Sequence, residues 1–199
     1  MVLDAREQVL DAAGRLFAER GVQAVGMDAI RDAAGISLKR IYALFPSKEA
    51  LVTATLRERE QVVLAQLEAI AARTEPPRER ILALFDLLAD WFAQPGYRGC
   101  EFVNAFGELG PSSESIATTV RDHKRAWVEL LERLVGEAGG SPPLAAQLSL
   151  LVNGAMVSAA IGATDEPAAE ARAAAAVLLD AALPAAGPRS RGRGATSAP

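Results

Sequence analysis

Apolar residues recur at three- and four-residue intervals along nearly the whole chain, and no stretch alternates apolar and polar residues as a half-buried β-strand does. The pattern therefore predicts an all-α protein. Its first apolar stripe covers residues 5–20 and ends at Gly21, where a left-handed C-terminal cap is expected. Two short helices follow, over residues 27–34 and 38–44, with Gly35 between them.

The remaining stripes are longer, and clusters of proline and glycine separate them. Four of the expected helices cover residues 48–73, 99–109, 143–163 and 167–183. Another ends at Pro95-Gly96, and another runs from a serine cap at Ser112 or Ser113 to Gly139. The last two along the chain are rich in Ala, Leu and Val. Such helices need a partner that covers their apolar faces.

Charge and cysteine content narrow the range of functions. The formal net charge is −4 and half of the residues are hydrophobic, so the chain can form a packed core but has no dominant basic surface. Any contact with nucleic acid must therefore be local. The single cysteine, Cys100, excludes an intramolecular disulfide, and charged residues interrupt the N-terminal segment where a signal peptide would lie. We expect a cytoplasmic protein.

One segment is long enough to span a bilayer, because residues 138–164 contain no ionisable side chain. It opens with Gly-Gly-Ser-Pro-Pro, and polar residues such as Gln147 and Asn153 interrupt the apolar remainder. We therefore expect a helix buried in a protein interface and no membrane association.

Residues 27–45 form two short helices separated by a tight glycine turn, which is the helix-turn-helix pattern. Ser37 is a good N-cap for the second helix, and Ile36 and Ile41 form a hydrophobic staple across it. Ile41, Leu44 and Phe45 are expected to face inward. The side chains left outward are Leu38, Lys39, Arg40, Tyr42 and Ala43.

This outward face has the chemistry of a DNA-reading surface. Residues 1–50 carry seven basic and seven acidic side chains, yet residues 33–48 contain Lys39, Arg40 and Lys48 and no acid. Lysine and arginine in the first turn of such a helix can reach base edges. Ser47 caps the next helix, whose amides and Lys48 suit a backbone phosphate, and the Tyr42 hydroxyl suits another. The alternative is a three-helix bundle with ordinary exposed charges.

The stretch GISLKRIYALFPSKEAL at residues 35–51, with LFAERG at 16–21, resembles the TetR family of bacterial transcriptional regulators. The matching positions cover about the first quarter of the chain: Ala34, Gly35, Ile36, Ser37, Tyr42, Phe45, Lys48, Glu49 and Leu51. Two departures stand out. Gly26 occupies a position where the family usually has serine or threonine, and Lys39-Arg40 replaces small residues, so the operator sequence cannot be inferred from relatives.

The resemblance implies a fold of about nine helices, the last two of which pack against their copies in a homodimer. Two-fold symmetry would then present two recognition helices to a palindromic DNA operator. The resemblance also implies a small-molecule effector that binds among the middle helices and changes the spacing of the two heads by moving the fourth helix. Repression by blocking polymerase is the default expectation, and activation stays open.

The expected effector site is partly apolar, with one titratable group. Its candidate residues are Trp91, Phe102, Phe106, His123, Trp127, Asn153 and Met156. The alternative is that these residues are plain core, and Asn104 and Asn153 could equally satisfy buried backbone groups. Cys100 lies at an expected helix start, which allows oxidant or electrophile sensing, but a small core residue is the favoured interpretation.

The expected organisation is a DNA-binding domain at 1–47, an effector-binding and dimerisation domain at 48–183, and a disordered tail at 184–199 whose three arginines are solvated. We expect no enzyme, cofactor or metal. One histidine and one cysteine cannot build the usual zinc sites, and Glu101 and Glu108 are expected on solvated helix faces. A helical interaction protein that has lost DNA affinity is a further alternative.

Overall fold

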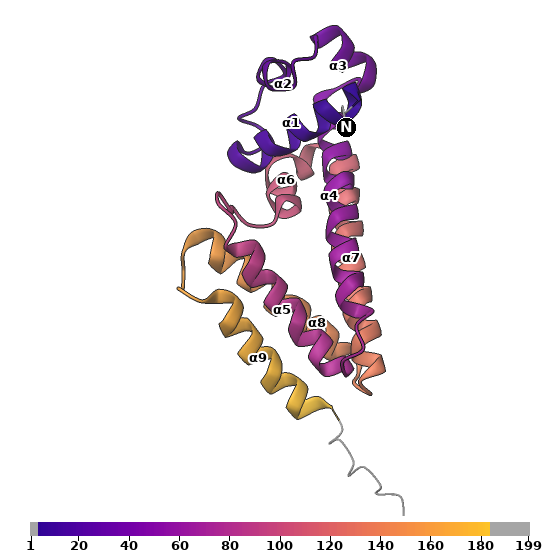
Figure 1. Ribbon diagram of the computed structural model, residues 1–199, viewed down its shortest axis with the longest axis vertical. Helices are drawn as coiled ribbons and strands as arrows, with labels where there is room; N and C mark the ends of the chain where they lie inside the picture. Colours follow the sequence, from indigo (N-terminus) through magenta and orange to yellow (C-terminus); the bar gives the residue numbers. More distant parts are fainter. Residues whose placement is uncertain (1–3, 184–199) are drawn as a thin grey trace, which may run out of the picture.

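The structure is a computed structural model that describes residues 4–183, and every regular element in this range is a helix. Residues 184–199, the expected disordered tail, lie outside the described residues. Figure 1 shows a small head at one end of the molecule and a longer helical body at the other. The elements are α1 (Ala5–Arg20), α2 (Met27–Ala34), α3 (Leu38–Leu44), α4 (Lys48–Ala71), α5 (Pro77–Phe92), α6 (Glu101–Leu109), the 3-10 turn η1 (Gly110–Ser112), α7 (Glu114–Glu137), α8 (Pro142–Ile161) and α9 (Pro167–Ala182).

The head consists of α1, α2 and α3 around one small core. α1 begins with a capping box, in which the Asp4 carboxylate accepts from the Glu7 amide at 2.9 Å and the Glu7 carboxylate accepts from the Asp4 amide at 2.9 Å. Because Leu51 of α4 belongs to the same core, the head also fixes the first turn of the long helix. The core residues are Val9, Leu10, Ala13, Leu16, Val25, Ile30, Ile41, Phe45 and Leu51.

Two glycines shape the turns of the head. Gly35 ends α2 at φ 66° and ψ 22°, the left-handed cap that glycine adopts without steric cost. At Gly21 the expectation of a left-handed cap is wrong, because φ is 83° but ψ is 158°. The chain leaves α1 in an extended direction, which turns the following backbone amides toward α6.

The head and body share the long helix α4, which packs along α7 (Figure 1). Ser113 is the N-cap of α7, with its hydroxyl accepting from the Ile116 amide at 3.2 Å. The hydroxyls of Ser113 and Ser115 donate to the Glu49 carboxylate at 2.5 and 2.7 Å, so the starts of α4 and α7 are tied together. A second core fills the space between head and body: Val22, Val52, Leu56, Phe102, Ala105, Ile116 and Val120.

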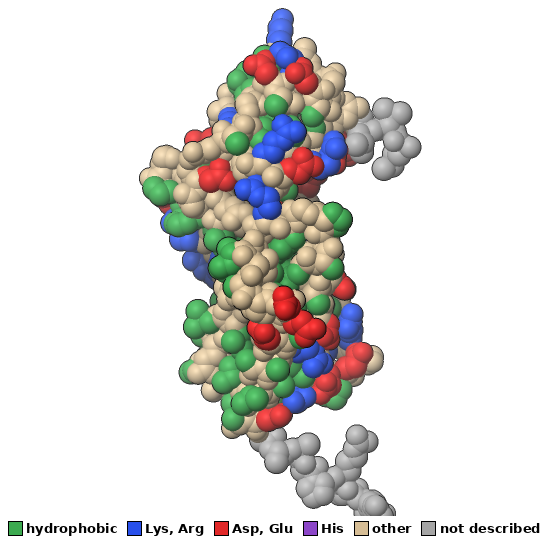
Figure 2. Space-filling view, turned by 90° about the vertical axis from the view of Figure 1, so that its left-hand side faces the viewer, with side chains coloured by type: hydrophobic (Ala, Val, Ile, Leu, Met, Phe, Trp, Pro, Cys, Tyr) green, Lys and Arg blue, Asp and Glu red, His purple; other side chains and the backbone are tan. Residues whose placement is uncertain are grey.

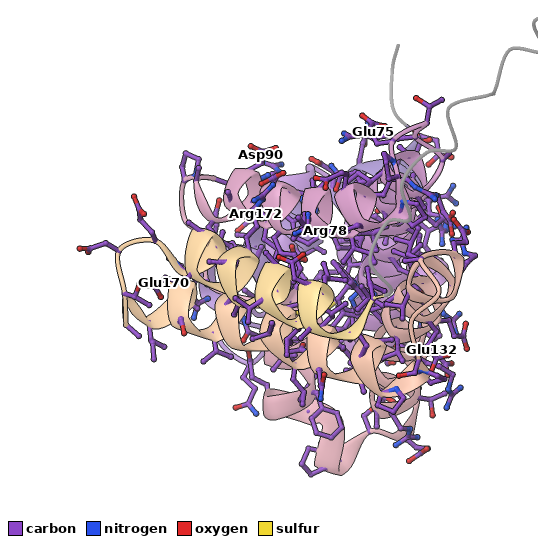
Figure 3. The ribbon with its side chains drawn as sticks, turned by 90° about the horizontal axis from the view of Figure 1, so that it is seen from below. Glu75, Arg78, Asp90, Glu132, Glu170 and Arg172 are labelled. Carbon is purple, nitrogen blue, oxygen red and sulfur yellow. The ribbon has the colours of Figure 1, made fainter. Side chains whose placement is uncertain are left out.

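The body is a bundle of the far ends of α4 and α7 with α5, α8 and α9. Its core includes Phe85, Trp91, Trp127 and Leu148, all buried. Two ion pairs join α5 to α9: Arg78 contacts Asp180 at 2.7 Å and Arg172 contacts Asp86 at 2.9 Å. Figure 3 shows both arginines where α5 and α9 meet. The charges of α9 that form these pairs therefore face α5.

A continuous apolar stripe stays uncovered on α8. Leu150 and Ile161 are each 72% exposed and Val157 is 53% exposed, while the opposite face of α8 is buried in the body core. Gly154 lies on the same stripe, and Val177 of α9 is 68% exposed. Figure 2 shows hydrophobic side chains gathered on the half of the molecule away from the head. Among the described residues, α8 is also the one helix long and apolar enough to cross a membrane by length and composition.

Candidate functional site

The second helix of the head motif, α3, has a firmly specified start. Ser37 accepts from the Arg40 amide at 3.3 Å, and Ile36 packs against the head core together with buried Ile41, as a hydrophobic staple requires. At its other end, Phe45 is buried and its amide donates to the Ile41 carbonyl. The orientation of α3 is therefore fixed by residues within the motif itself.

This orientation leaves Lys39, Arg40, Tyr42 and Ala43 exposed, whereas Leu38 is half-buried. Within residues 4–183, neither Lys39 nor Arg40 forms an ion pair or a side-chain hydrogen bond. Arg31 on the neighbouring α2 differs, because its guanidinium contacts Asp28 at 2.6 Å and Asp32 at 2.8 Å. Of the three cations in residues 27–45, the two that are free to meet a partner therefore lie on α3.

The start of α4 lies beside this face. The Ser47 hydroxyl accepts from the Ala50 amide at 3.0 Å, as expected of an N-cap. Lys48 is half-buried; burial lowers the pKa of its ammonium, and the nearby Glu108 carboxylate opposes that shift. Gly26 caps α2 without a side-chain hydrogen bond, so this position offers no hydroxyl to a phosphate.

A cavity of about 170 Å³ lies where α1, α4, α6 and α7 meet, next to the 94–100 loop. The Trp91 and Trp127 rings meet edge to face with centroids 6.1 Å apart, and the Phe102 ring stacks on His123 at 3.5 Å. For scale, an engineered apolar cavity of roughly 150 Å³ binds benzene. The space therefore suits one ring.

Two neutral polar groups border this cavity without a partner. His123 is 2% exposed, and its Nδ1 lies 3.7 Å from a Glu60 carboxylate oxygen, beyond hydrogen-bond distance. Burial, reinforced by Lys124 and Arg59, lowers the pKa of His123 to about 3, so the imidazole is neutral at physiological pH. The buried Tyr97 hydroxyl also lacks a partner, and burial raises its pKa.

Five of the seven expected ligand-binding residues line this cavity, and two do not. Phe106 is 42% exposed and lies against Gly110, because it sits on the outer side of α6. Asn153 lies off the cavity, where its amide donates to the Ser149 carbonyl at 2.8 Å and its oxygen accepts from Lys124 at 2.8 Å. The residues that line it are Trp91, Phe102, His123, Trp127 and Met156.

Cys100 is half-buried and borders the cavity, with the Lys124 ammonium 3.6 Å from its sulfur. Asn104 also borders the cavity, but its amide donates to the Arg98 carbonyl at 2.9 Å. Asn104 therefore satisfies a backbone carbonyl, which is one of the two roles expected for it.

Sequence reasoning placed Glu101 and Glu108 on solvated faces, and the structure corrects both. Glu101 borders the cavity 3.3 Å from Arg59, and burial raises its pKa. Glu108 accepts from the amides of Val22 and Gln23 at 3.1 and 2.6 Å, and the Gln23 side chain donates to the Glu108 carbonyl at 2.7 Å. These contacts join α6 to the loop between α1 and α2. They cross more than 80 residues of sequence, so helical periodicity carries no signal for them.

A capped second helix with unpaired cations, on a three-helix head joined to a helical body, defines a helix-turn-helix protein. Residues 9–55 match the family described as bacterial regulatory proteins, tetR family. A crystal structure of a TetR-type transcriptional regulator from Streptomyces avermitilis is 32% identical, covers 90% of this chain and 98% of its own, and superposes with a TM-score of 0.82. The chain belongs to the TetR family of helix-turn-helix transcriptional regulators, and the predicted nine-helix all-α fold is confirmed for the described residues.

One curated relative is named a repressor and another is named an activator. The HTH-type transcriptional repressor KstR2 of Mycolicibacterium smegmatis is 27% identical over 144 residues, which cover 70% of this chain and 69% of that protein. The HTH-type transcriptional activator FasR of the same organism is 33% identical over 97 residues, which cover 48% of this chain and 44% of that protein.

Proposed function

We propose that this regulator is a repressor that binds a palindromic DNA operator as a homodimer and is released by a small-molecule effector. The observation that carries the proposal is the exposed, unpaired Lys39-Arg40 pair on the capped helix α3. With a net charge of −4, attraction to DNA must be local, and this pair supplies it. The proposed domains are a DNA-binding unit at 1–47 and an effector-binding and dimerisation unit at 48–183.

The proposed DNA contacts divide by type. Lys39 and Arg40 reach base edges in the major groove, where lysine or arginine bonded to guanine is the commonest specific contact. Tyr42 and Lys48 contact phosphates, which fix the register of the protein on the duplex. Leu38 and Ala43 supply apolar contact, and the capping hydroxyls of Ser37 and Ser47 keep the two helix starts in place.

The proposed dimer forms through α8 and α9. The uncovered stripe of Leu150, Gly154, Val157 and Ile161 repeats at four-, three- and four-residue intervals, so it lies on one side of α8. Packing this stripe and Val177 against a second copy removes them from water and buries the apolar α8 segment in protein. Two-fold symmetry then spaces the α3 helices by ~34 Å or a multiple, one DNA turn or more.

The proposed effector site is the cavity between α1, α4, α6 and α7. α4 borders the cavity along Val52, Leu56 and Arg59, and its first turn carries Leu51 of the head core. A ligand that fits the cavity better in one position of α4 shifts the spacing of the two heads. The cavity contacts the head directly through Phe17 and Ala18 of α1.

The decisive experiment selects bound DNA from a random duplex pool and then measures affinity at several salt concentrations. We expect an inverted repeat, and an affinity that falls steeply with salt because phosphate contacts release counterions. A chain that recovers no sequence motif at low salt would instead be a helical interaction protein. A reporter gene behind the selected site then separates repression from activation, because only a repressor lowers its expression. This role is non-enzymatic and places the protein in the bacterial cytoplasm.

A further inference from the structure

The charges that line the cavity cancel in sum. Two acidic and two basic side chains border it, and Arg59 and Glu101 pair with each other. Arg59 lies 3.3 Å from Glu101, Arg98 donates to the Ala18 carbonyl at 3.5 Å, and Glu108 accepts from two backbone amides. A charged ligand would have to break one of these pairs or bring an uncompensated charge into a partly buried site, and both are costly.

The groups that lack partners are neutral. The imidazole of His123 is uncharged in the fold and can donate from one nitrogen and accept at the other. The Tyr97 hydroxyl stays protonated, and it can donate and accept. Buried polar groups in proteins are nearly always hydrogen-bonded, so the unpartnered Tyr97 hydroxyl at this cavity points to a ligand that supplies the missing bond. The unpartnered Nδ1 of His123 lies toward Glu60, outside the cavity lining, so the His123 ring offers its other nitrogen.

The volume and the lining of the cavity indicate the size and the apolar part of the ligand. A volume of about 170 Å³ is slightly larger than the cavity of roughly 150 Å³ that binds benzene, so it suits one ring with a small substituent. Trp91, Trp127 and Phe102 offer ring faces and edges, and Met156 adds an adaptable apolar side chain.

We propose that the cavity takes a neutral molecule of one aromatic ring that carries a hydroxyl or carbonyl group. The ring packs among Trp91, Phe102 and Trp127, and the polar group bonds to His123 or Tyr97. This inference rests on the proposed function only in taking the cavity as the effector site, since it concerns the chemistry of the ligand and not the operator.

The test compares four probes of nearly equal size by calorimetry on the full chain: benzyl alcohol, toluene, benzoate and benzylamine, which is cationic at neutral pH. We expect benzyl alcohol to bind at least tenfold more tightly than benzoate and benzylamine, and more tightly than toluene. A preference for benzoate or benzylamine overturns the proposal in favour of a charged ligand.

Two variants locate the polar contact. Tyr97→Phe removes one hydroxyl, and His123→Phe keeps a ring on Phe102 but removes both nitrogens. We expect at least one of them to lower the preference for benzyl alcohol over toluene about fivefold, the effect of one hydrogen bond. Thr118→Val, which removes an exposed hydroxyl outside the cavity, is the control and leaves the preference unchanged. If both cavity variants keep the full preference for benzyl alcohol over toluene, the assignment of the polar contact to Tyr97 or His123 is wrong.

DNA binding separates failure of this inference from failure of the proposed function. If the unliganded chain binds its selected operator but none of the four probes binds the chain, the one-ring proposal is overturned and the regulator stands. If benzyl alcohol binds with the expected selectivity but no operator is found, the ligand class is supported and operator binding is overturned.

Discussion

The head and the body of this protein are specified in different ways. In the head, short-range signals fix each helix: the Asp4 capping box starts α1, the left-handed Gly35 ends α2 and the Ser37 cap starts α3. In the body, long apolar helices pack into a shared core and still leave an uncovered stripe on α8. The head is therefore complete within one chain, whereas the body has a surface that a second chain would complete.

The largest expected effect, loss of the dimer itself, tests this incompleteness at Gly154. A Cβ built on this residue meets nothing within 4 Å in the single chain, so Gly154→Leu should fold and even gain up to about 1 kcal/mol of helix propensity. In the proposed dimer the leucine would hold the two α8 helices apart. We expect light scattering after gel filtration to show one chain mass instead of two, with operator affinity lowered more than about a hundredfold through the loss of bivalent binding.

Gly136 of α7 supplies the matched control, because it too is exposed and has open space around its Cβ position. Gly136→Leu should keep both the mass and the operator affinity of the parent. Equal masses for the parent and Gly154→Leu would show that the α8 stripe is not the interface, and that the body is complete without a partner there.

The second prediction tests DNA reading by α3 of the head. Replacing Lys39 and Arg40 together by alanine should lower affinity for the selected operator by about 2–6 kcal/mol, since each base contact contributes about 1–3 kcal/mol, and should flatten the preference among operator variants. Fluorescence anisotropy on a panel of mutated sites measures both. Arg125→Ala, which removes an exposed cation from α7, should change neither value. A double variant that keeps its discrimination among sites would exclude α3 as the reading helix.

The contrast between short-range signals and long-range contacts also explains what could be predicted from the sequence. Ser37, Gly35 and the staple of Ile36 and Ile41 act over a few residues, so their pattern predicted the orientation of α3 that the structure shows. The apolar stripes likewise predicted the body helices to within a few residues of their bounds. The contacts of Glu108 were missed because they join segments far apart in the chain, and the pattern cannot tell a solvated carboxylate from one that accepts two backbone amides.

The third prediction concerns His123 in the body. Its pKa of about 3 in the fold lies below the ordinary value of 6.5, so between these values the unfolded chain binds a proton that the folded chain does not. Stability is therefore lost as pH falls below 6.5, by up to about 1.4 kcal/mol per pH unit, and the loss is complete near pH 3. Urea unfolding of the parent and His123→Phe from pH 4 to pH 8 measures the difference.

The charged groups near His123 are Glu60, Arg59 and Lys124, and all three are present in both proteins. The difference between the two pH profiles therefore isolates the histidine. The profiles should run parallel above pH 7 and converge or cross below it. Parallel profiles over the whole range would mean that the imidazole takes up a proton in the fold, and that the interior at this point is wetter than its 2% exposure indicates.

The smallest expected effect tests the joint between head and body. Glu108→Ala removes both acceptors of the Val22 and Gln23 amides, and we expect a cost of about 1 kcal/mol because the contacts are only partly buried. Glu108→Gln keeps one acceptor oxygen, so it should retain part of the stability that the alanine variant loses. Hydrogen exchange should show faster amides at residues 22 and 23 in the alanine variant, with the α3 amides unchanged, because α3 is fixed by its own cap. Faster exchange throughout the head would instead show that it depends on the body for its stability, which would overturn the contrast between a self-contained head and an incomplete body.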